Sequence, residues 1–295
     1  MPGGDHRRHP VVAWRVRSDG GRGSRGVRLG VVRGRWRAIL ADVDDAAAVW
    51  TGRQEGRGIP AQVLAKAAAN PWHHEVSRFA APSEPVDTPS RSAALELLGE
   101  SGTVLDVGCG GGAASFALAG PAIHLTGVDQ QQDMLDAFAG EARARGVPHR
   151  TVLGRWPEAA ASAGTADVVV CHHVLHNVVD LVPFVRALTS AARRGVVVEM
   201  MAQHPMAWLD PLWLRFHDLQ RPPSATTDDA VAVLREIGIN AAVQRWERAD
   251  GPGRSDAAEV TRRLCLPPEA EPEVAGALDG LERSRLAATL RWSVA

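Results

Sequence analysis

The chain has no tyrosine, a single lysine (Lys66) and only three cysteines in 295 residues. Three widely spaced cysteines do not form a disulfide framework, so we expect a protein of the reducing cytoplasm. No run approaches the ~18 consecutive apolar residues of a membrane-spanning helix. The N-terminal arginines are not followed by an apolar segment, so no secretory signal is expected. A hydrophobic share of 45% and a charged share of 23% are typical of globular proteins.

Positive charge is concentrated at the N-terminus. Residues 1–40 contain ten arginines and two acids, a net charge of +8, and since the whole chain carries −1, the remainder carries −9. Glycine and arginine alternate over residues 20–26, a composition that buries too little apolar surface to offset chain entropy. We expect residues 1–48 to be a disordered extension, the alternatives being a nucleic-acid-binding arm or a translation start further along. The acidic remainder makes nucleic acid an unlikely partner.

The segment 49–87 has irregular helical patterning. A proline in the first turn predicts a helix over residues 61–68. Thr88 is the expected N-cap of a second helix, with Pro89 at its first position. We expect residues 49–87 to form a helical lid or cap.

From residue 88 onward, strand patterns alternate with helix patterns. The expected strands are residues 104–107, 123–128, 149–153, 167–171, 196–200, 242–247 and 286–294. The expected helices are residues 112–119, 130–145, 157–163, 181–192 and 228–237, with another helical segment between the last two strands. Such alternation predicts an α/β fold with a doubly wound, mostly parallel seven-stranded sheet over residues 88–295. Its valine-rich strands are apolar throughout, as strands covered on both faces are.

The most informative segment is residues 104–112, where a strand runs into alternating glycines and a helix follows. Glycines permit a sharp turn and a close ligand approach, and this turn lies at the carboxyl ends of the strands. Asp106, two residues before the first glycine, would repel the pyrophosphate of a dinucleotide but suits a ligand with an ammonium group. Asp129 ends the next strand, where a carboxylate can accept hydrogen bonds from both ribose hydroxyls.

These residues resemble the first motif of the class I S-adenosylmethionine-dependent methyltransferases, an acidic residue followed by alternating glycines. The resemblance covers residues 88–294, and more narrowly the chain is similar to methyltransferase-domain proteins of actinobacteria. It implies a Rossmann-like fold with an N-terminal helical extension, and S-adenosyl-L-methionine as the cofactor. The cofactor contacts that it implies are Asp106, Gly108, Cys109, Gly110, Gly112, Asp129, Gln130, Arg155, Trp156 and His172.

Two positions after the third strand depart from the family pattern or have two interpretations. Arg155 stands where the family often has a polar or acidic residue that contacts the adenine amino group. Trp156 either stacks on the adenine face or packs against the start of a helix, and both alternatives stay open.

A string of histidines follows the fourth strand and resembles the family motif that faces the methyl group. Adjacent histidines on a strand point to opposite sides, and neither CxxC nor HExxH occurs, so no metal is expected. We predict that His173 or His176 is a general base for the acceptor, the alternative being a role as pocket wall.

The predicted function is S-adenosylmethionine-dependent methyl transfer to a small molecule. The aromatic-rich segment 204–217 and Trp72 with its two following histidines are candidates for acceptor binding. The Asn-Pro-Pro-Tyr and Pro-Cys motifs of DNA methyltransferases do not occur. The alternatives are a non-catalytic S-adenosylmethionine-binding sensor or scaffold and an NAD(P)-dependent oxidoreductase. The sequence does not indicate an oligomeric state.

Overall fold

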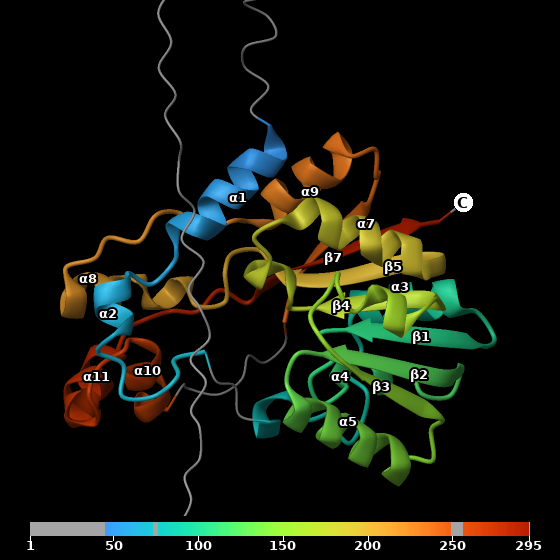
Figure 1. Cartoon of the computed structure of the whole chain (residues 1–295), viewed down its shortest axis with the longest axis horizontal. Coiled ribbons are helices and arrows are strands. Elements are labelled where there is room, and N and C mark those ends of the chain that lie inside the picture. Colours follow the sequence, from blue (N-terminus) through green and yellow to red (C-terminus); the bar gives the residue numbers. More distant parts are fainter. Residues whose placement is uncertain (1–44, 73–75, 249–255, 295) are drawn as a thin grey trace, which may run out of the picture. The chain divides into compact units, whose positions relative to one another are not determined.

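The computed structural model describes residues 45–72, 76–248 and 256–294 (Figure 1). The predicted disordered extension therefore lies outside the described residues, apart from residues 45–48. None of the described helices is both long and apolar enough to cross a bilayer.

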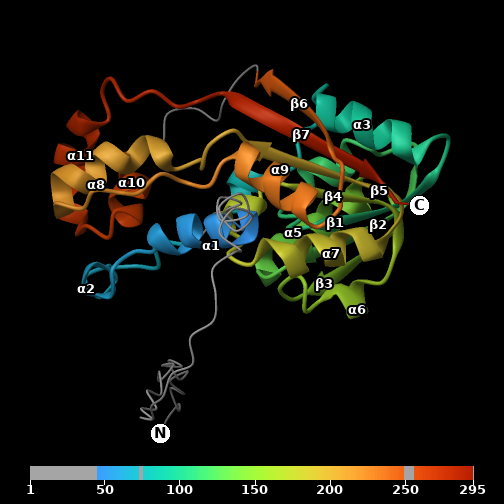
Figure 2. The ribbon, with the colours of Figure 1, turned by 90° about the horizontal axis from the view of Figure 1, so that it is seen from above.

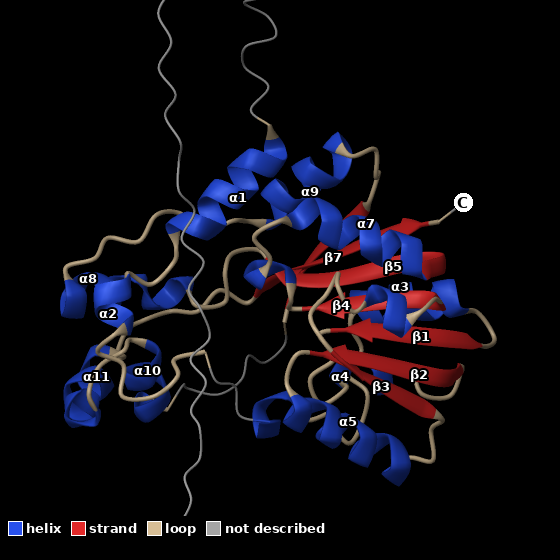
Figure 3. Cartoon of the chain, viewed as in Figure 1, coloured by secondary structure: helices blue, strands red, loops and turns tan. Residues whose placement is uncertain are grey.

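Seven strands form one sheet in the order β3-β2-β1-β4-β5-β7-β6. The first five strands in this order are mutually parallel, and β7 runs antiparallel to both β5 and β6. The strands are β1 (Gly102–Val107), β2 (Ala122–Asp129), β3 (His149–Leu153), β4 (Ala166–His172), β5 (Ala192–Met201), β6 (Ala242–Glu247) and β7 (Leu286–Ser293). The predicted doubly wound, mostly parallel sheet is confirmed, with helices on both of its faces (Figure 3).

Most of the predicted helices are present, some of them shorter than expected. The α-helices are α1 (Ala46–Gly56), α2 (Ala61–Leu64), α3 (Pro89–Leu98), α4 (Ala113–Phe116), α5 (Gln132–Ala144), α6 (Ala160–Ala163), α7 (Leu181–Ala191), α8 (Asp210–His217), α9 (Thr227–Glu236), α10 (Ala257–Arg263) and α11 (Glu271–Ala277). The 3-10 helices are η1 (Val76–Phe79), η2 (Leu175–Asn177), η3 (Ala207–Leu209) and η4 (Pro268–Ala270). As predicted, Thr88 caps α3, accepting a hydrogen bond at Oγ1 from the Arg91 amide at 3.1 Å.

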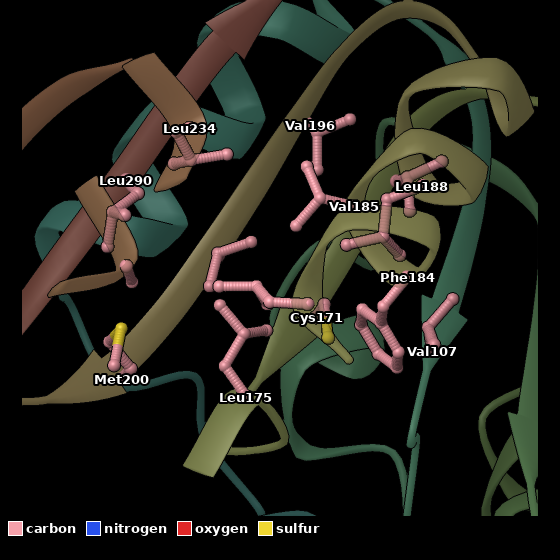
Figure 4. Close-up of a cluster of buried hydrophobic side chains, with 14 of the residues drawn as sticks. Val107, Cys171, Leu175, Phe184, Val185, Leu188, Val196, Met200, Leu234 and Leu290 are labelled. Carbon is pink, nitrogen blue, oxygen red and sulfur yellow. The ribbon is translucent and has the colours of Figure 1, made fainter. Parts of the chain in front are cut away.

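Two apolar cores lie on opposite faces of the sheet because side chains alternate along each strand. Val168 and Val170 of β4 belong to the core with α3, α4 and α5. Val169 and Cys171 belong to the core with α7 and α9 (Figure 4). All four side chains are fully buried, which explains why this strand is apolar throughout.

Helix α1 begins within the segment expected to be disordered, whereas its residues from 49 onward lie in the expected helical lid or cap. Asp45 is its N-cap, and the indole of Trp50 is fully buried in the core with α7 and α9. The expected boundary at residue 48 therefore falls inside a helix. The helix predicted over residues 61–68 is limited to α2, four residues long.

A third apolar cluster joins helices from three distant parts of the chain. We call it the helical cluster: its buried residues come from α2, η3, α8, α10 and α11 and the ends of these elements. Figures 1 and 2 show these helices gathered beyond the carboxyl ends of the parallel strands. The segments inserted after β5 and between β6 and β7 therefore supply walls outside the sheet.

Candidate active site

A large open cleft crosses the carboxyl ends of the parallel strands and extends to the helical cluster. Its lining includes every predicted site residue except Gly112. The sequence motifs after β1, β2, β3 and β4 are thus brought together at one edge of the sheet, as expected for the ligand site of an open α/β fold.

The glycine loop after β1 requires left-handed backbone. Gly108, Gly110 and Gly112 have φ values of 72°, 49° and 90°. A Cβ on Gly108 would lie 2.4 Å from Cγ2 of Val174, in the segment that follows β4. The glycine loop and the end of β4 therefore pack too closely for a side chain. Gly112 does not line the cleft and serves to start α4.

Asp106 lies at the floor of the cleft and is only 1% exposed. The Ser115 hydroxyl donates a short hydrogen bond to its Oδ2. Burial raises the pKa of Asp106 to about 7, because water no longer solvates the charged form, while the bond from Ser115 opposes this shift. A buried carboxyl group of this kind is ready to be ionised by a cationic ligand.

Asp129 at the end of β2 is half-buried and holds the glycine loop. Its Oδ2 accepts a hydrogen bond from the Gly110 amide, and its Oδ1 accepts one from the Gln131 amide, both at 3.0 Å. A carboxylate has about four lone-pair sites, so each oxygen retains one for a ligand.

The remaining predicted cofactor residues differ in how they meet the cleft. Gln130 and Arg155 are exposed on its wall. Trp156 lines the cleft but also packs against the core, and its Nε1 donates to the Phe184 carbonyl at 3.2 Å. The Cys109 side chain is buried, and a Cβ on Gly127 would lie 2.9 Å from its Sγ. Cys109 can therefore offer a ligand its backbone more readily than its thiol.

The three histidines at the end of β4 and just beyond it have different surroundings. His173 has left-handed backbone at φ 61° and a side chain that is 35% exposed. His176 is buried, with Nε2 3.0 Å from the Met201 carbonyl oxygen. Burial lowers the pKa of His172 to about 4 and that of His176 to about 3. These two imidazoles are therefore neutral at physiological pH.

A buried glutamate on β5 organises the site. Glu199 is 4% exposed, and its Oε1 lies 2.9 Å from His173 Nε2. Arg248, just after β6, donates from Nη1 to the same oxygen at 3.1 Å, and this Nη1 lies 2.7 Å from His173 Nε2. Burial alone would raise the pKa of Glu199. The interaction with His173, the charges of the neighbouring histidines and a smaller contribution from Ser90 outweigh this effect and lower the pKa to about 2.

Sequence analysis did not find Glu199, Arg248 or Ser115. Glu199 had a usable signal, because it interrupts the otherwise apolar run of a strand that is buried on both faces. Arg248 and Ser115 had none, since their roles depend on contacts between distant segments. Among the described residues, no group of histidine, cysteine, aspartate and glutamate side chains is arranged to hold a metal ion.

Helix α1 fastens the loop that follows the histidines. Trp50 Nε1 donates to the Val178 carbonyl at 2.8 Å, and Thr51 donates to the Val179 carbonyl at 3.1 Å. The Gln54 amide reaches the carbonyls of Leu175, His176 and Val178 at 3.3, 2.9 and 3.1 Å. The position of this loop therefore depends on a helix more than 120 residues away in the sequence.

Comparison with known proteins agrees with the resemblance found in the sequence. Residues 104–195 match the family described as a methyltransferase domain. The chain is 30% identical over 109 residues to a ubiquinone biosynthesis O-methyltransferase of Aeromonas salmonicida, covering 36% of this chain and 46% of the relative. It is 32% identical over 130 residues to the protein of that name from Sodalis glossinidius, covering 42% and 51%. The chain thus spans about half the length of the curated relatives it matches.

A solved structure of magnesium protoporphyrin IX methyltransferase from Synechocystis PCC 6803 is similar at a TM-score of 0.48. Its sequence is 14% identical, over 85% of this chain and all of that one. The family match over residues 104–195 and the strand order of the sheet both indicate a methyltransferase domain. On these grounds the chain carries a class I S-adenosylmethionine-dependent methyltransferase domain.

Proposed function

We propose that this chain transfers a methyl group from S-adenosylmethionine to an oxygen atom of a small molecule. The observation that carries the proposal is the contact of His173 with Glu199, which sets an oriented imidazole in the same cleft as Asp106 and Asp129. A hydroxyl acceptor has to lose a proton, and histidine suits that task near neutral pH. The O-methyltransferase names of the partial-length relatives support the choice of oxygen.

The cleft residues fit a cationic nucleoside cofactor. Asp106 offers a buried carboxylate to a positively charged amino-acid group, where opposite charge favours its ionised form. Asp129 retains lone pairs for two ribose hydroxyls after accepting from the two amides. Gln130, Arg155 and Trp156 line the adjoining wall and would hold the adenine.

When bound, the cofactor supplies an electrophilic methyl group on a sulfonium, which is a good leaving group. The protein has to hold the acceptor in line and move one proton, and orientation of this kind contributes ~7–11 kcal/mol in favourable cases. His173 Nε2 lies 2.9 Å from Glu199 Oε1 and 2.7 Å from Arg248 Nη1. In the tautomer with Nε2–H directed to Glu199, the bare Nδ1 takes the hydroxyl proton. Nδ1 has no hydrogen-bond partner among the described residues and is not enclosed. The ionised Glu199 then stabilises the imidazolium.

His173 suits the role of base better than His176. The Nε2 of His176 is engaged by the Met201 carbonyl, and burial holds its pKa near 3. Such an imidazole accepts a proton poorly at neutral pH, so we propose His176 as pocket wall.

A small molecule suits this cleft better than nucleic acid, because the chain beyond residue 40 carries a net charge of −9. A cytoplasmic location remains a prediction from cysteine content, and all three cysteines are unpaired and buried.

The experiment is to incubate the protein with methyl-labelled S-adenosylmethionine and a panel of phenols, catechols, thiols and amines. We expect label in a methyl ether and release of S-adenosylhomocysteine. His173→Gln should lower turnover by about 10²-fold, whereas the control His149→Gln on β3, outside the cleft, should not. Labelled products formed only from amines or thiols would overturn the oxygen acceptor. No turnover with any acceptor, despite tight cofactor binding, would favour a sensor or scaffold.

A further inference from the structure

We infer that His176 and His204 bind a hydroxyl group of the methyl acceptor, other than the oxygen that receives the methyl group. The inference rests on the proposed function and deepens it, because it names a chemical group that the acceptor has to carry. In this scheme the two imidazoles determine which acceptors fit, and His173 remains the base.

The two imidazoles come from different segments of the chain and pack against each other. His176 follows β4, and His204 follows β5. Their ring centroids lie 5.6 Å apart, with the ring planes at 68° in an edge-to-face arrangement. Both residues line the same cleft as His173. The two rings therefore form one continuous part of the cleft wall.

The backbone fixes the proton of His176 on Nε2. The Met201 carbonyl oxygen lies 3.0 Å from Nε2, and a carbonyl oxygen only accepts, so Nε2 donates to it. Nδ1 is enclosed and has no hydrogen-bond partner among the described residues. A second proton on Nδ1 would give a buried cation with an unpaired donor, which burial disfavours. Nδ1 therefore carries a lone pair that can accept one hydrogen bond.

The backbone also fixes the proton of His204. The Met206 amide donates to its Nδ1 at 3.0 Å, so Nδ1 is bare. Burial and the charge of Arg57 lower the pKa of His204 to about 4 although Asp210 opposes them, so the ring is neutral and its proton lies on Nε2. This Nε2 is bonded to none of the described residues and is not enclosed. His204 therefore offers a hydrogen-bond donor to the cleft.

A lone pair and an N–H on adjoining rings match a hydroxyl group. Its oxygen accepts from His204 Nε2–H, while its proton goes to His176 Nδ1. A methyl ether has no proton for Nδ1, and a carboxylate would set its own lone pairs against it. Because Nδ1 is enclosed, the group that reaches it has to be small, and the cleft wall around it has to shift as the acceptor binds.

A structural role alone does not account for His176. The Met201 carbonyl also accepts from the Thr227 hydroxyl at 3.3 Å, so it would stay paired without an imidazole. An apolar side chain would fill the position without leaving a buried nitrogen unpaired, which weakens the fold. Two more enclosed and unpaired atoms, His172 Nε2 and Trp208 Nε1, belong to residues that line the cleft. Unpaired polar atoms are thus concentrated around this cleft.

The test compares phenol with catechol, resorcinol and hydroquinone, which place a second hydroxyl at three distances from the first. Calorimetry on full-length protein saturated with S-adenosylhomocysteine gives the dissociation constants. We expect one of the three dihydroxybenzenes to bind about tenfold tighter than phenol, the scale of one added hydrogen bond. His176→Phe should remove this preference, because it keeps a ring but loses the lone pair.

His217→Phe is the matched control. Its Nε2 also lies close to a backbone carbonyl oxygen, that of Leu264 at 2.6 Å, but His217 does not line the cleft. This variant should retain the preference for the second hydroxyl.

The ¹⁵N chemical shifts of the imidazoles test the inference in the parent protein, so the result does not depend on whether His176→Phe folds. His176 should show the Nε2–H form, and the preferred dihydroxybenzene should move its Nδ1 signal while leaving the His217 signals unchanged. An equal preference in parent and folded His176→Phe would overturn the inference, as would no preference for any dihydroxybenzene or an Nδ1 signal that does not respond. Full turnover in His173→Gln would overturn the proposed function instead, and the Nδ1 signal would still report whether His176 binds the hydroxyl.

Discussion

His173 is bound to Glu199 through both its main chain and its side chain. The His173 amide donates to the Glu199 carbonyl at 2.7 Å, while Nε2 lies 2.9 Å from Oε1 of the same residue. These contacts hold a non-glycine residue at φ 61°, a conformation that costs free energy and persists where neighbouring structure enforces it. The imidazole is thereby presented to the cleft in one orientation.

Glu199→Gln should lower turnover by about 10²-fold or more, because an amide can donate to Nε2 and select the tautomer with Nδ1–H. Steady-state kinetics with the identified acceptor measures this effect. Glu247→Gln, an exposed cleft residue on β6, is the control and should retain turnover. Equal turnover of Glu199→Gln and the parent would contradict a role for the carboxylate in orienting His173.

Asp129→Ala should weaken S-adenosylmethionine binding at least tenfold. Two charge-assisted bonds to the ribose would be lost, each worth about 1.5–3 kcal/mol. Titration calorimetry measures the dissociation constant, and circular dichroism checks folding because the Gly110 and Gln131 amides also lose their acceptor. Asp133→Asn in the first turn of α5 is a surface control. An unchanged constant in a folded Asp129→Ala variant would remove the ribose assignment.

Cofactor affinity should rise with pH because of Asp106. Burial raises its pKa to about 7 in the free protein, and a cationic amino-acid group binds the ionised form. Below that pH, the dissociation constant should fall nearly tenfold for each unit by which the pH rises. Above that pH, it should level off. Calorimetry with S-adenosylhomocysteine from pH 5.5 to 8.5 (about one and a half units on either side) tests this, and a flat profile would contradict it. Asp106→Asn should flatten the dependence.

Asp106 should also make the ligand-free protein less stable as pH rises. Its folded pKa of about 7 lies above the ordinary value of 3.8, so its contribution is fully present below pH 3.8 and is lost as pH rises through 7. Glu199 acts in the opposite sense: its pKa of about 2 gives stability above pH 4.5 that is lost as pH falls through 2. Urea unfolding of the parent and of Asp106→Asn between pH 4 and 8 (about the window of Asp106) isolates the first contribution. Parallel pH profiles of the unfolding free energy for the parent and Asp106→Asn would contradict this contribution of Asp106.

Trp50→Ala should destabilise the protein by about 3–5 kcal/mol, the usual range for a buried aromatic side chain. The indole is fully buried and bonded to the Val178 carbonyl.

Deletion of residues 1–44, which ends just before the Asp45 cap, should leave the melting temperature unchanged given the composition of that segment. Thermal unfolding measures the effect of each change. A fall of several degrees on deletion would show that the segment stabilises the domain.

The sheet was predictable because its signals are local. The valine runs, the glycine turn and the Thr88 cap each act within a few residues, and they indicated the strands, the cleft edge and the start of α3. The start of helix α1 escaped prediction because the helix has only one fully buried side chain, Trp50, and little helical patterning. Its stability comes from distant partners that no window of sequence contains.

The candidate site was predictable for the cofactor half and not for the acceptor half. The acids and glycines of the first half lie within 24 residues, from Asp106 to Asp129, on adjoining strands. The second half joins Glu199 on β5 with His173 just after β4 and Arg248 just after β6, and the order of these strands is set by the whole sheet. Periodicity identifies a strand but does not identify its neighbour, so this cluster became visible only in three dimensions.

The fastening of the β4 loop by α1 also divides the protein into parts that can open separately. Among the described residues, the side chains of Trp50, Thr51 and Gln54 donate hydrogen bonds to loop carbonyls and take no part in the sheet hydrogen bonds. Detachment of α1 is therefore a sub-global opening that releases residues 175–179 while the strands stay paired. In an amide hydrogen-exchange experiment, the loop should exchange together with a helix far away in sequence, and the valines of β4 and β5 should exchange last.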